Sequence, residues 1–392
     1  MNRAVIITIG IIIIVLVLGV WIYLMLFGTP KNGGEVFANL GFEVSPQATT
    51  ITPPINTQPL DTLIDTGSKD ALRQLTTRPV AGFAFASTSA GQTVRYVERG
   101  TGHMYEIHLE SGVETILSRT TIPQVSGAVF SPDASTVALT SYQGYQSSVF
   151  VGTLGDDENI VGIALQPDAR NLSFSSDTEV LYTVASGGTT KGYLHNIQTL
   201  AQSELFTMNY TNLDVGWGSG LDEIYLATKP SQEFEGFIYT TDNNVLTPAT
   251  PSAYGLSALF TNDYILTTFI KDAVYTSAAI DDAGVSHSLP LIALKEKCVF
   301  DTQNTNYIWC AAPTEQTDPS FVEDWYKGTV TSQDNLWLIN ILAQTAQLYA
   351  NPNSLVGRTI DVTSIDTNAV GDTLTFTNKI DHTLWLYDLS VE

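Results

Sequence analysis

The chain has 392 residues, of which 44% are hydrophobic and only 15% are charged, and its formal net charge is −23 at pH 7. This charge excludes nucleic acid as a partner, because affinity for a phosphate backbone comes largely from basic side chains. It also disfavours broad contact with anionic lipid headgroups. The 17 Tyr and 16 Phe fit sheets better than helices, which favours an all-β domain.

The chain begins with a long apolar segment, residues 4–27, that contains no Asp, Glu, Lys, Arg or His. At about 1.5 Å per residue it spans roughly 36 Å, enough to cross a bilayer as a tilted helix. A cleaved signal peptide is the alternative, but its apolar core is usually about 7–15 residues long and precedes a small-x-small site. Because this segment is longer and runs into Phe27-Gly-Thr-Pro, it predicts a transmembrane anchor.

The flanking charges predict the orientation of this anchor. Arg3 precedes the segment, whereas Lys31 after it is offset by Glu35, so residues 1–28 form a cytoplasmic stub and a single-pass anchor in the cell membrane. Residues 29–70 are rich in Thr, Pro, Gly and Asn and predict an extended extracytoplasmic linker. A short apolar patch within this linker, residues 36–42, is a second candidate for contact with the membrane or a partner.

A repeat runs through the rest of the chain, residues 71–392. Each unit starts with an aromatic or aliphatic residue, followed by a polar turn and an alternating strand. Successive starting residues are 45, 44, 43, 43, 40 and 65 positions apart. A four-stranded propeller blade takes about 40–45 residues, so these spacings predict a seven-bladed β-propeller with an insertion near its end. The starting residues are Phe85, Phe130, Phe174, Trp217, Phe260, Phe300 and Ile365.

Both ends of this domain suggest how the ring closes. A second alternating segment, the third strand of a blade, follows about 20 residues after most starting residues, and the last one is residues 384–389. The chain therefore lacks a fourth strand for its last blade. Residues 71–77 are otherwise unassigned and resemble the fourth strand at 113–118, so we expect them to complete that blade and remove the exposed sheet edge.

One turn resembles a known family. Residues 130–138 read FSPDASTVA, which resembles the F-S-P-D-G-x-x-[IL]-A signature of WD-like repeats in TolB-type bacterial propellers, and FSSD at residue 174 is similar. The arrangement of anchor, linker and propeller also resembles membrane-anchored propellers of bacterial cell envelopes. This resemblance implies an interaction propeller of the periplasmic type, but it implies no particular ligand.

The only two cysteines flank a short polar segment, residues 301–306. In an antiparallel hairpin centred near Asn304, Cys298 and Cys310 would lie opposite each other, close enough for a disulfide. An oxidising compartment outside the cytoplasm permits this bond, which we therefore expect in preference to two free buried thiols.

The insertion that delays the seventh unit, residues 312–335, lies between the second and third strands of the sixth blade. Its aromatic residues Phe321, Trp325 and Tyr326 are candidates for binding a partner, because aromatic side chains on a long loop often anchor interfaces. Alternatively, they fold down over the blade edges or the channel.

No catalytic or metal-binding motif emerges from the sequence. The segment 216–220 reads GWGSG, which is not a nucleophile elbow, and the five histidines have no paired spacing. The acidic clusters 156–158 and 281–282 lack the alternating pattern of a calcium loop. We therefore expect no catalytic residue, no metal and no cofactor.

Two functional hypotheses remain open. The first is a non-enzymatic scaffold that binds an envelope protein or a cell-wall component. The second is a glycan-active or other hydrolase that uses carboxylates of the propeller channel, which requires two acids about 5–9 Å apart in an open cleft.

Overall fold

The computed structural model describes residues 71–392, except 89–90, 145, 156, 219–222, 243, 262, 314–319 and 392. The predicted anchor at 4–27 and linker at 29–70 lie outside these residues. The chain divides into two compact units, 1–61 and 62–392, and only the second contains described residues. Among the helices of this described part, none is long and apolar enough to cross a membrane.

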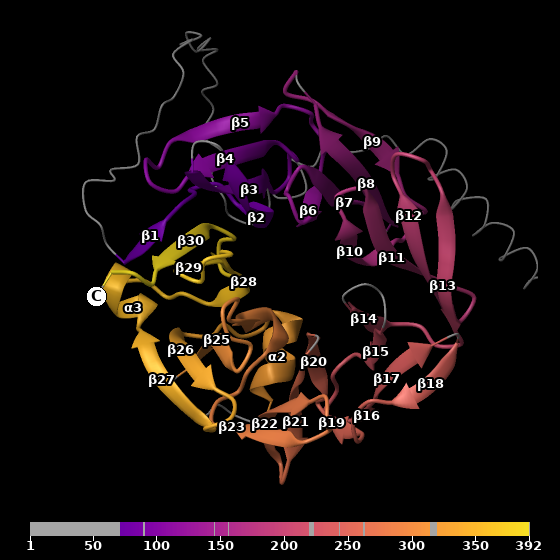
Figure 1. The fold of residues 1–392 in the computed structure, drawn as a ribbon, viewed down its shortest axis with the longest axis vertical. Coiled ribbons are helices and arrows are strands. Elements are labelled where there is room, and N and C mark those ends of the chain that lie inside the picture. The colour runs from indigo at the N-terminus through magenta and orange to yellow at the C-terminus, as the bar shows by residue number, and fades with distance from the viewer. Residues whose placement is uncertain are drawn as a thin grey trace, which may run out of the picture. The chain divides into compact units, whose positions relative to one another are not determined.

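The described strands form seven four-stranded antiparallel sheets, which are arranged as the blades of a ring (Figure 1). Blades 1 to 4 comprise β2 (Val80–Thr88), β3 (Gly91–Glu98), β4 (Met104–His108) and β5 (Glu114–Ser118); β6 (Val125–Phe130), β7 (Thr136–Gln143), β8 (Gln146–Leu154) and β9 (Ile160–Ala164); β10 (Arg170–Ser176), β11 (Glu179–Ser186), β12 (Thr189–Asn196) and β13 (Gln202–Met208); and β14 (Leu213–Trp217), β15 (Ile224–Thr228), β17 (Ile238–Asp242) and β18 (Val245–Pro248). Blades 5 to 7 comprise β20 (Ser257–Phe260), β21 (Tyr264–Lys271), β22 (Val274–Asp281) and β23 (Ser286–Leu289); β24 (Cys298–Phe300), β25 (Tyr307–Pro313), β26 (Asp334–Asn340) and β27 (Thr345–Ala350); and β28 (Val362–Thr367), β29 (Thr373–Asn378), β30 (Leu384–Asp388) and β1 (Leu72–Gln74).

Short elements occupy the connections between these strands. The described residues include a two-stranded sheet of β16 (Glu235–Gly236) and β19 (Ala253–Tyr254), the 3-10 helix η2 (Lys295–Lys297) and the helices α2 (Phe321–Lys327) and α3 (Pro352–Val356).

The predicted repeat is confirmed, since all seven starting residues fall on the first strand of a blade. This strand is the one nearest the central channel (Figure 1). The period of the repeat follows from the size of a blade, because each unit supplies one four-stranded sheet. β29, the second strand of blade 7, is buried along its whole length, as expected of a strand that is covered on both faces.

The predicted ring closure is also confirmed. β1 pairs antiparallel with β30, with Leu72 opposite Tyr387 and Gln74 opposite Trp385. Leu72 is 5% exposed and packs into the apolar cluster between blades 6 and 7. Burying a leucine side chain contributes roughly 1.5–3 kcal/mol, so this strand stabilises the ring as well as covering its edge.

The hydrophobic core is divided into clusters between neighbouring blades. Leu384 and Leu386 of blade 7 pack with Val80, Val94 and Ile107 of blade 1, for example. The blades are therefore held in place by their neighbours, and closure at β1 and β30 fixes the whole ring.

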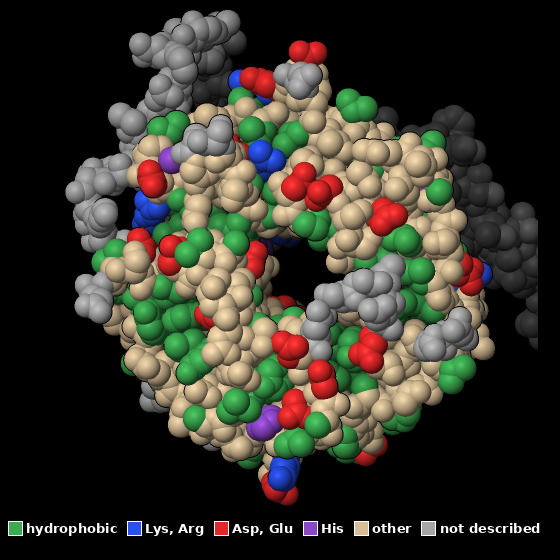
Figure 2. All heavy atoms as spheres, in the orientation of Figure 1, with side chains coloured by type: hydrophobic (Ala, Val, Ile, Leu, Met, Phe, Trp, Pro, Cys, Tyr) green, Lys and Arg blue, Asp and Glu red, His purple; other side chains and the backbone are tan. Residues whose placement is uncertain are grey.

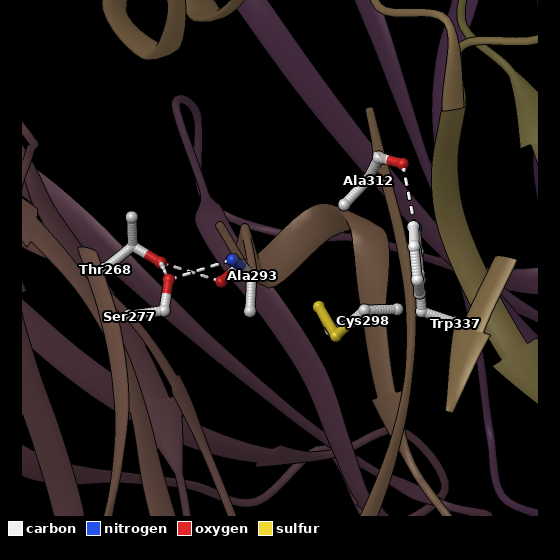
Figure 3. The surroundings of a disulfide bond; sticks show 7 residues. Thr268, Ser277, Ala293, Cys298, Ala312 and Trp337 are labelled. Carbon is white, nitrogen blue, oxygen red and sulfur yellow. Dashed lines mark hydrogen bonds between the residues drawn. A yellow bond between two sulfur atoms is a disulfide. The ribbon is translucent and has the colours of Figure 1, made fainter. Parts of the chain in front are cut away.

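The predicted disulfide is present. Cys298 on β24 pairs with Cys310 on β25, and their Cα atoms lie 4.2 Å apart. Figure 3 shows Cys298 beside the connection from blade 5 to blade 6, where Ala293 exchanges hydrogen bonds with Thr268 and Ser277 at 2.7 and 2.8 Å. The disulfide thus lies in a densely bonded junction between two blades.

Candidate functional site at the channel mouth

The turns between the first and second strands of the blades meet at one end of the channel, here called the channel mouth. Neighbouring turns are joined by hydrogen bonds: Thr302 Oγ1 donates to Asn368 O at 3.2 Å, and the Asp133 N–H donates to Asp177 Oδ1 at 3.0 Å. Asn368 Nδ2 also donates to Gln92 Oε1 at 2.8 Å, across the point where the last blade meets the first. Figure 2 shows a hollow at the centre of the ring, with Asp and Glu side chains around its rim.

A cavity of about 760 Å³ opens at this mouth, between blades 7, 1 and 2. Phe83 and Phe85 of β2 and Phe130 of β6 contribute apolar walls, and Asp133 and Asp366 contribute carboxylates. This volume is in the range of sites that bind small molecules or short segments of a larger ligand.

A close approach of two inner strands shapes the cavity wall. Gly82 of β2 lies so close to β6 that a Cβ atom at this position would be 2.1 Å from the Ala128 carbonyl oxygen. Ala128 lines the cavity. Only glycine permits this spacing of β2 and β6, so the shape of the wall depends on Gly82.

The Asp366 carboxylate lies near the end of β28. Burial in the cavity raises its pKa to about 6, although it accepts a hydrogen bond from the Thr367 N–H at 2.9 Å. Asp366 therefore changes between its neutral and charged forms close to neutral pH. A carboxyl group with this property can serve as a proton donor or as a pH-dependent contact.

The other cavity carboxylate, Asp133, behaves in the opposite way. Partial burial acts to raise its pKa, but hydrogen bonds from the Ser135 N–H and from Ser131 Oγ, both at 2.8 Å, more than offset that effect and leave the pKa below its ordinary value. The cavity thus combines one permanently charged carboxylate with one that titrates.

The insertion between β25 and β26 folds down onto the propeller, so the second of its two predicted arrangements is the one present. Trp325 is 3% exposed, and its Nε1 donates to Asp361 Oδ1 at 2.9 Å. Tyr326 donates its hydroxyl to Glu296 Oε2 at 2.8 Å, and burial raises the pKa of this hydroxyl. Phe321 is half-buried against the same cluster. The three residues are thus brought together by α2, but their role in binding a partner stays a prediction.

A buried ionic cluster fixes this insertion. Lys297 is 1% exposed and donates to Asp334 Oδ2 at 2.5 Å and to Asp361 Oδ1 at 2.7 Å. The ammonium groups of Lys297 and Lys379 lie 4.6 and 4.0 Å from the centre of the Trp325 ring. Burial raises the pKa of Asp334 despite the adjacent Lys297, and burial lowers that of Lys379. Lys297, Asp334 and Asp361 are paired and buried, and Lys379 donates to the Trp325 carbonyl oxygen, so we assign these groups a structural role.

The described residues do not include three His, Cys, Asp or Glu side chains placed to hold a metal ion. His195 has both ring nitrogens buried without a hydrogen-bond partner in the described part of the chain, and burial lowers its pKa. It therefore fits a neutral residue packed within blade 3.

Sequence reasoning did not single out the cavity residues. Asp133 belongs to the FSPD turn at residues 130–133, and Asp366 follows the starting residue of the seventh unit. Their shared position in the repeat could have indicated the site. Each acid lies at or just before the turn that follows an inner strand, and the inner strands surround the channel.

No protein-family model matches the sequence, and no curated protein matches it significantly. Solved structures do resemble it. The β-propeller domain of the Trilobed protease from Pyrococcus furiosus, described as having an open velcro topology, is 10% identical over 79% of this chain and 96% of that one, with a TM-score of 0.52. An oligogalacturonate lyase in complex with manganese is 10% identical over 82% of this chain and 93% of that one, with a TM-score of 0.55.

A third similar structure is the GH74 enzyme of Niastella koreensis, which is 13% identical over 82% of this chain and 55% of that one, with a TM-score of 0.54. Unlike the open domain of the Trilobed protease, this chain closes its ring through β1 and β30. At such identities the likeness shows the fold alone: this chain is an all-β, seven-bladed propeller.

Proposed function

We propose that this chain is a membrane-anchored, extracytoplasmic propeller that binds an envelope protein or a cell-wall component at its channel mouth. The apolar segment at 4–27 supports the anchor, and the charge bias around it supports a cytoplasmic N-terminus. The disulfide between Cys298 and Cys310 supports an oxidising compartment. The resemblance of residues 130–138 to TolB-type propellers supports an interaction role.

The observation that carries this proposal is the cavity at the mouth. Its walls come from inner strands and short turns of blades 7, 1 and 2, with Thr302 of blade 6, so its shape is set by the closed ring. It combines aromatic walls with a few polar groups, which is the usual composition of a binding site. In this proposal the half-buried Phe321 and Tyr326 of the insertion offer a further contact, while the buried Trp325 fixes α2 on the propeller.

Site-specific photo-crosslinking in intact cells tests this proposal. A photoreactive amino acid replaces Val370, which is 55% exposed and lines the cavity. The matched control replaces Leu355, which is 56% exposed on α3, in the connection between blades 6 and 7 at the outer edge of the ring (Figure 1). We expect a covalent adduct with an envelope component from position 370 and none from position 355. Equal adducts from both positions, or none from position 370, would refute it.

The second hypothesis, a glycan-active or other hydrolase, is favoured by one specific observation. Asp366 has a pKa of about 6, which suits a general acid near neutral pH. Among the similar structures are a lyase, a GH74 enzyme and acylaminoacyl peptidases. Incubating the full chain with a panel of polysaccharides tests this reading: product formation that is abolished by Asp366→Asn would support it over a pure binding role.

A further inference from the structure

We infer that the channel mouth recognises a cationic segment of a polypeptide, whose Lys or Arg side chains contact a ring of carboxylates while neighbouring apolar side chains enter the cavity. This inference rests on the proposed binding function and names the chemistry of its ligand.

The turns of the mouth carry charge of one sign. Every blade except the first has an acidic residue among the described residues of this turn, and those described residues include no Lys, Arg or His. Asp366 adds a further carboxylate inside the cavity. The acidic residues of the turns are Asp133, Asp177, Glu223, Asp263, Asp301 and Asp372.

These carboxylates have no cationic partner among the described residues, since none of them takes part in an ion pair within 4.0 Å. Their contacts are with neutral groups, such as the Tyr225 hydroxyl that donates to Glu223. The Arg95 guanidinium reaches the mouth turn of blade 2, where it donates to Ala134 O at 2.8 Å, but it is already paired with Glu106 at 2.8 Å.

The other end of the channel shows the opposite arrangement. There, Lys295 pairs with Asp214 at 2.6 Å, Arg358 pairs with Asp381, and Lys297 pairs with two aspartates. These buried and half-buried acids are neutralised, whereas none of the acids in the mouth turns has a cationic partner among the described residues. A ring of like charges around a cavity concentrates the field there and attracts ligands of opposite charge.

A second, independent observation points to a ligand at the same place. Thr367 lines the cavity and is 6% exposed, yet its Oγ1 has no hydrogen-bond partner among the described residues. A buried hydroxyl without a partner is destabilising, and most buried polar groups find one. A ligand that enters the cavity and displaces the groups covering Thr367 Oγ1 would supply the missing partner through a peptide N–H or C=O.

The spacing of the carboxylates favours an extended ligand over a single ion. They are distributed over six blades, and no three of the acids, histidines or cysteines in the described residues come together as a metal site does. An extended polypeptide advances about 3.3–3.6 Å per residue and can therefore reach several blades at once. The rings of Phe83, Phe85 and Phe130 suit apolar side chains between the charges and can also pack against a guanidinium or ammonium group.

The test uses the full chain in detergent micelles and a fluorescent peptide of alternating lysine and phenylalanine, with fluorescence anisotropy as the readout. A matched peptide has glutamine in place of lysine. The mouth variant carries Asp133→Asn, Asp366→Asn and Asp372→Asn, which remove charge but keep the shape and one acceptor oxygen in each side chain. The control variant carries Glu233→Gln, Glu235→Gln and Asp272→Asn, which remove the same charge from exposed residues in connections between second and third strands.

We expect the lysine peptide to bind the wild-type chain and the control variant equally well within about twofold, and the mouth variant at least about tenfold more weakly. Added salt should weaken binding to the wild type, because the contacts are between charges. The glutamine peptide should not bind.

Three results would overturn the inference: equal affinity of the wild type and the mouth variant, equal binding of both peptides, or tighter binding of a cationic oligosaccharide such as chitosan fragments. If the lysine peptide fails to bind while crosslinking through position 370 still captures an envelope component, this inference is wrong and the proposed binding function stands. Failure of both experiments would reject both.

Discussion

Replacing Lys297 with methionine should strongly destabilise the propeller. Its ammonium group is 1% exposed and balances Asp334 and Asp361, both 0% exposed, which also hold Trp325 and Ser332 of the insertion. Removing one partner of a buried ionic cluster leaves an uncompensated charge, which lowers the free energy of unfolding by about 3–5 kcal/mol. This is a large part of the stability of a typical domain.

Equilibrium urea denaturation, followed by tryptophan fluorescence, measures this loss. In the Lys297→Met chain the pKa of Asp334, which burial already raises, should rise further in the folded state, so Asp334 binds a proton more readily when folded than when unfolded. The destabilisation should therefore shrink as the pH falls and grow as it rises, opposite to the usual behaviour of a paired carboxylate.

Lys327 provides a matched control, because it lies on the exposed side of α2 and pairs only with surface acids. Lys327→Met should leave the unfolding midpoint almost unchanged. A Lys297→Met chain as stable as the Lys327→Met chain would refute the view that this ionic cluster holds the insertion in place.

Three further predictions follow from the closure, the disulfide and the cavity. Leu72→Asp should lower the free energy of unfolding by at least about 3 kcal/mol, because it places a carboxylate in the buried closing strand. Leu355→Asp at an exposed site should change the thermal midpoint little, and equal midpoints of the two variants would contradict the role of β1. Reduction of the disulfide, which links residues 12 positions apart, should lower the free energy of unfolding, measured in urea, by about 3 kcal/mol. The reductant should not affect a Cys298→Ser, Cys310→Ser chain, and a similar effect on the wild type and this variant would show that it acts elsewhere. Binding of the lysine peptide should weaken as the pH falls through about 6, since Asp366 is then protonated, and Asp366→Asn should flatten this step; an unchanged step in that variant would assign it to another group.

The fold could be predicted because its signals are local and repeated. Each starting residue, such as Phe130 or Trp217, marks a strand whose neighbours in the sheet follow directly along the chain. The disulfide was predictable for the same reason, since Cys298 and Cys310 face each other in one hairpin. Closure by β1 required a long-range argument, but the missing fourth strand of the last blade supplied it.

The site could not be predicted in the same way. Asp133 and Asp366 are far apart in the sequence, and only closure of the ring brings blade 2 and blade 7 to one cavity. The folding down of Trp325 depends on Lys297 and Asp361, which read as ordinary surface charges in a sequence, since charged side chains are rarely fully buried. Local patterns therefore predict the blades, whereas contacts between blades determine the site.

The central claim is that uncompensated carboxylates at the channel mouth bind a cationic envelope partner. The most direct test combines the photoreactive residue at position 370 with Asp133→Asn, Asp366→Asn and Asp372→Asn in intact cells. The account predicts that the adduct formed in the wild-type background is lost when these carboxylates are replaced, and retained in the Glu233→Gln, Glu235→Gln, Asp272→Asn background. An adduct of undiminished yield in the mouth variant would contradict it.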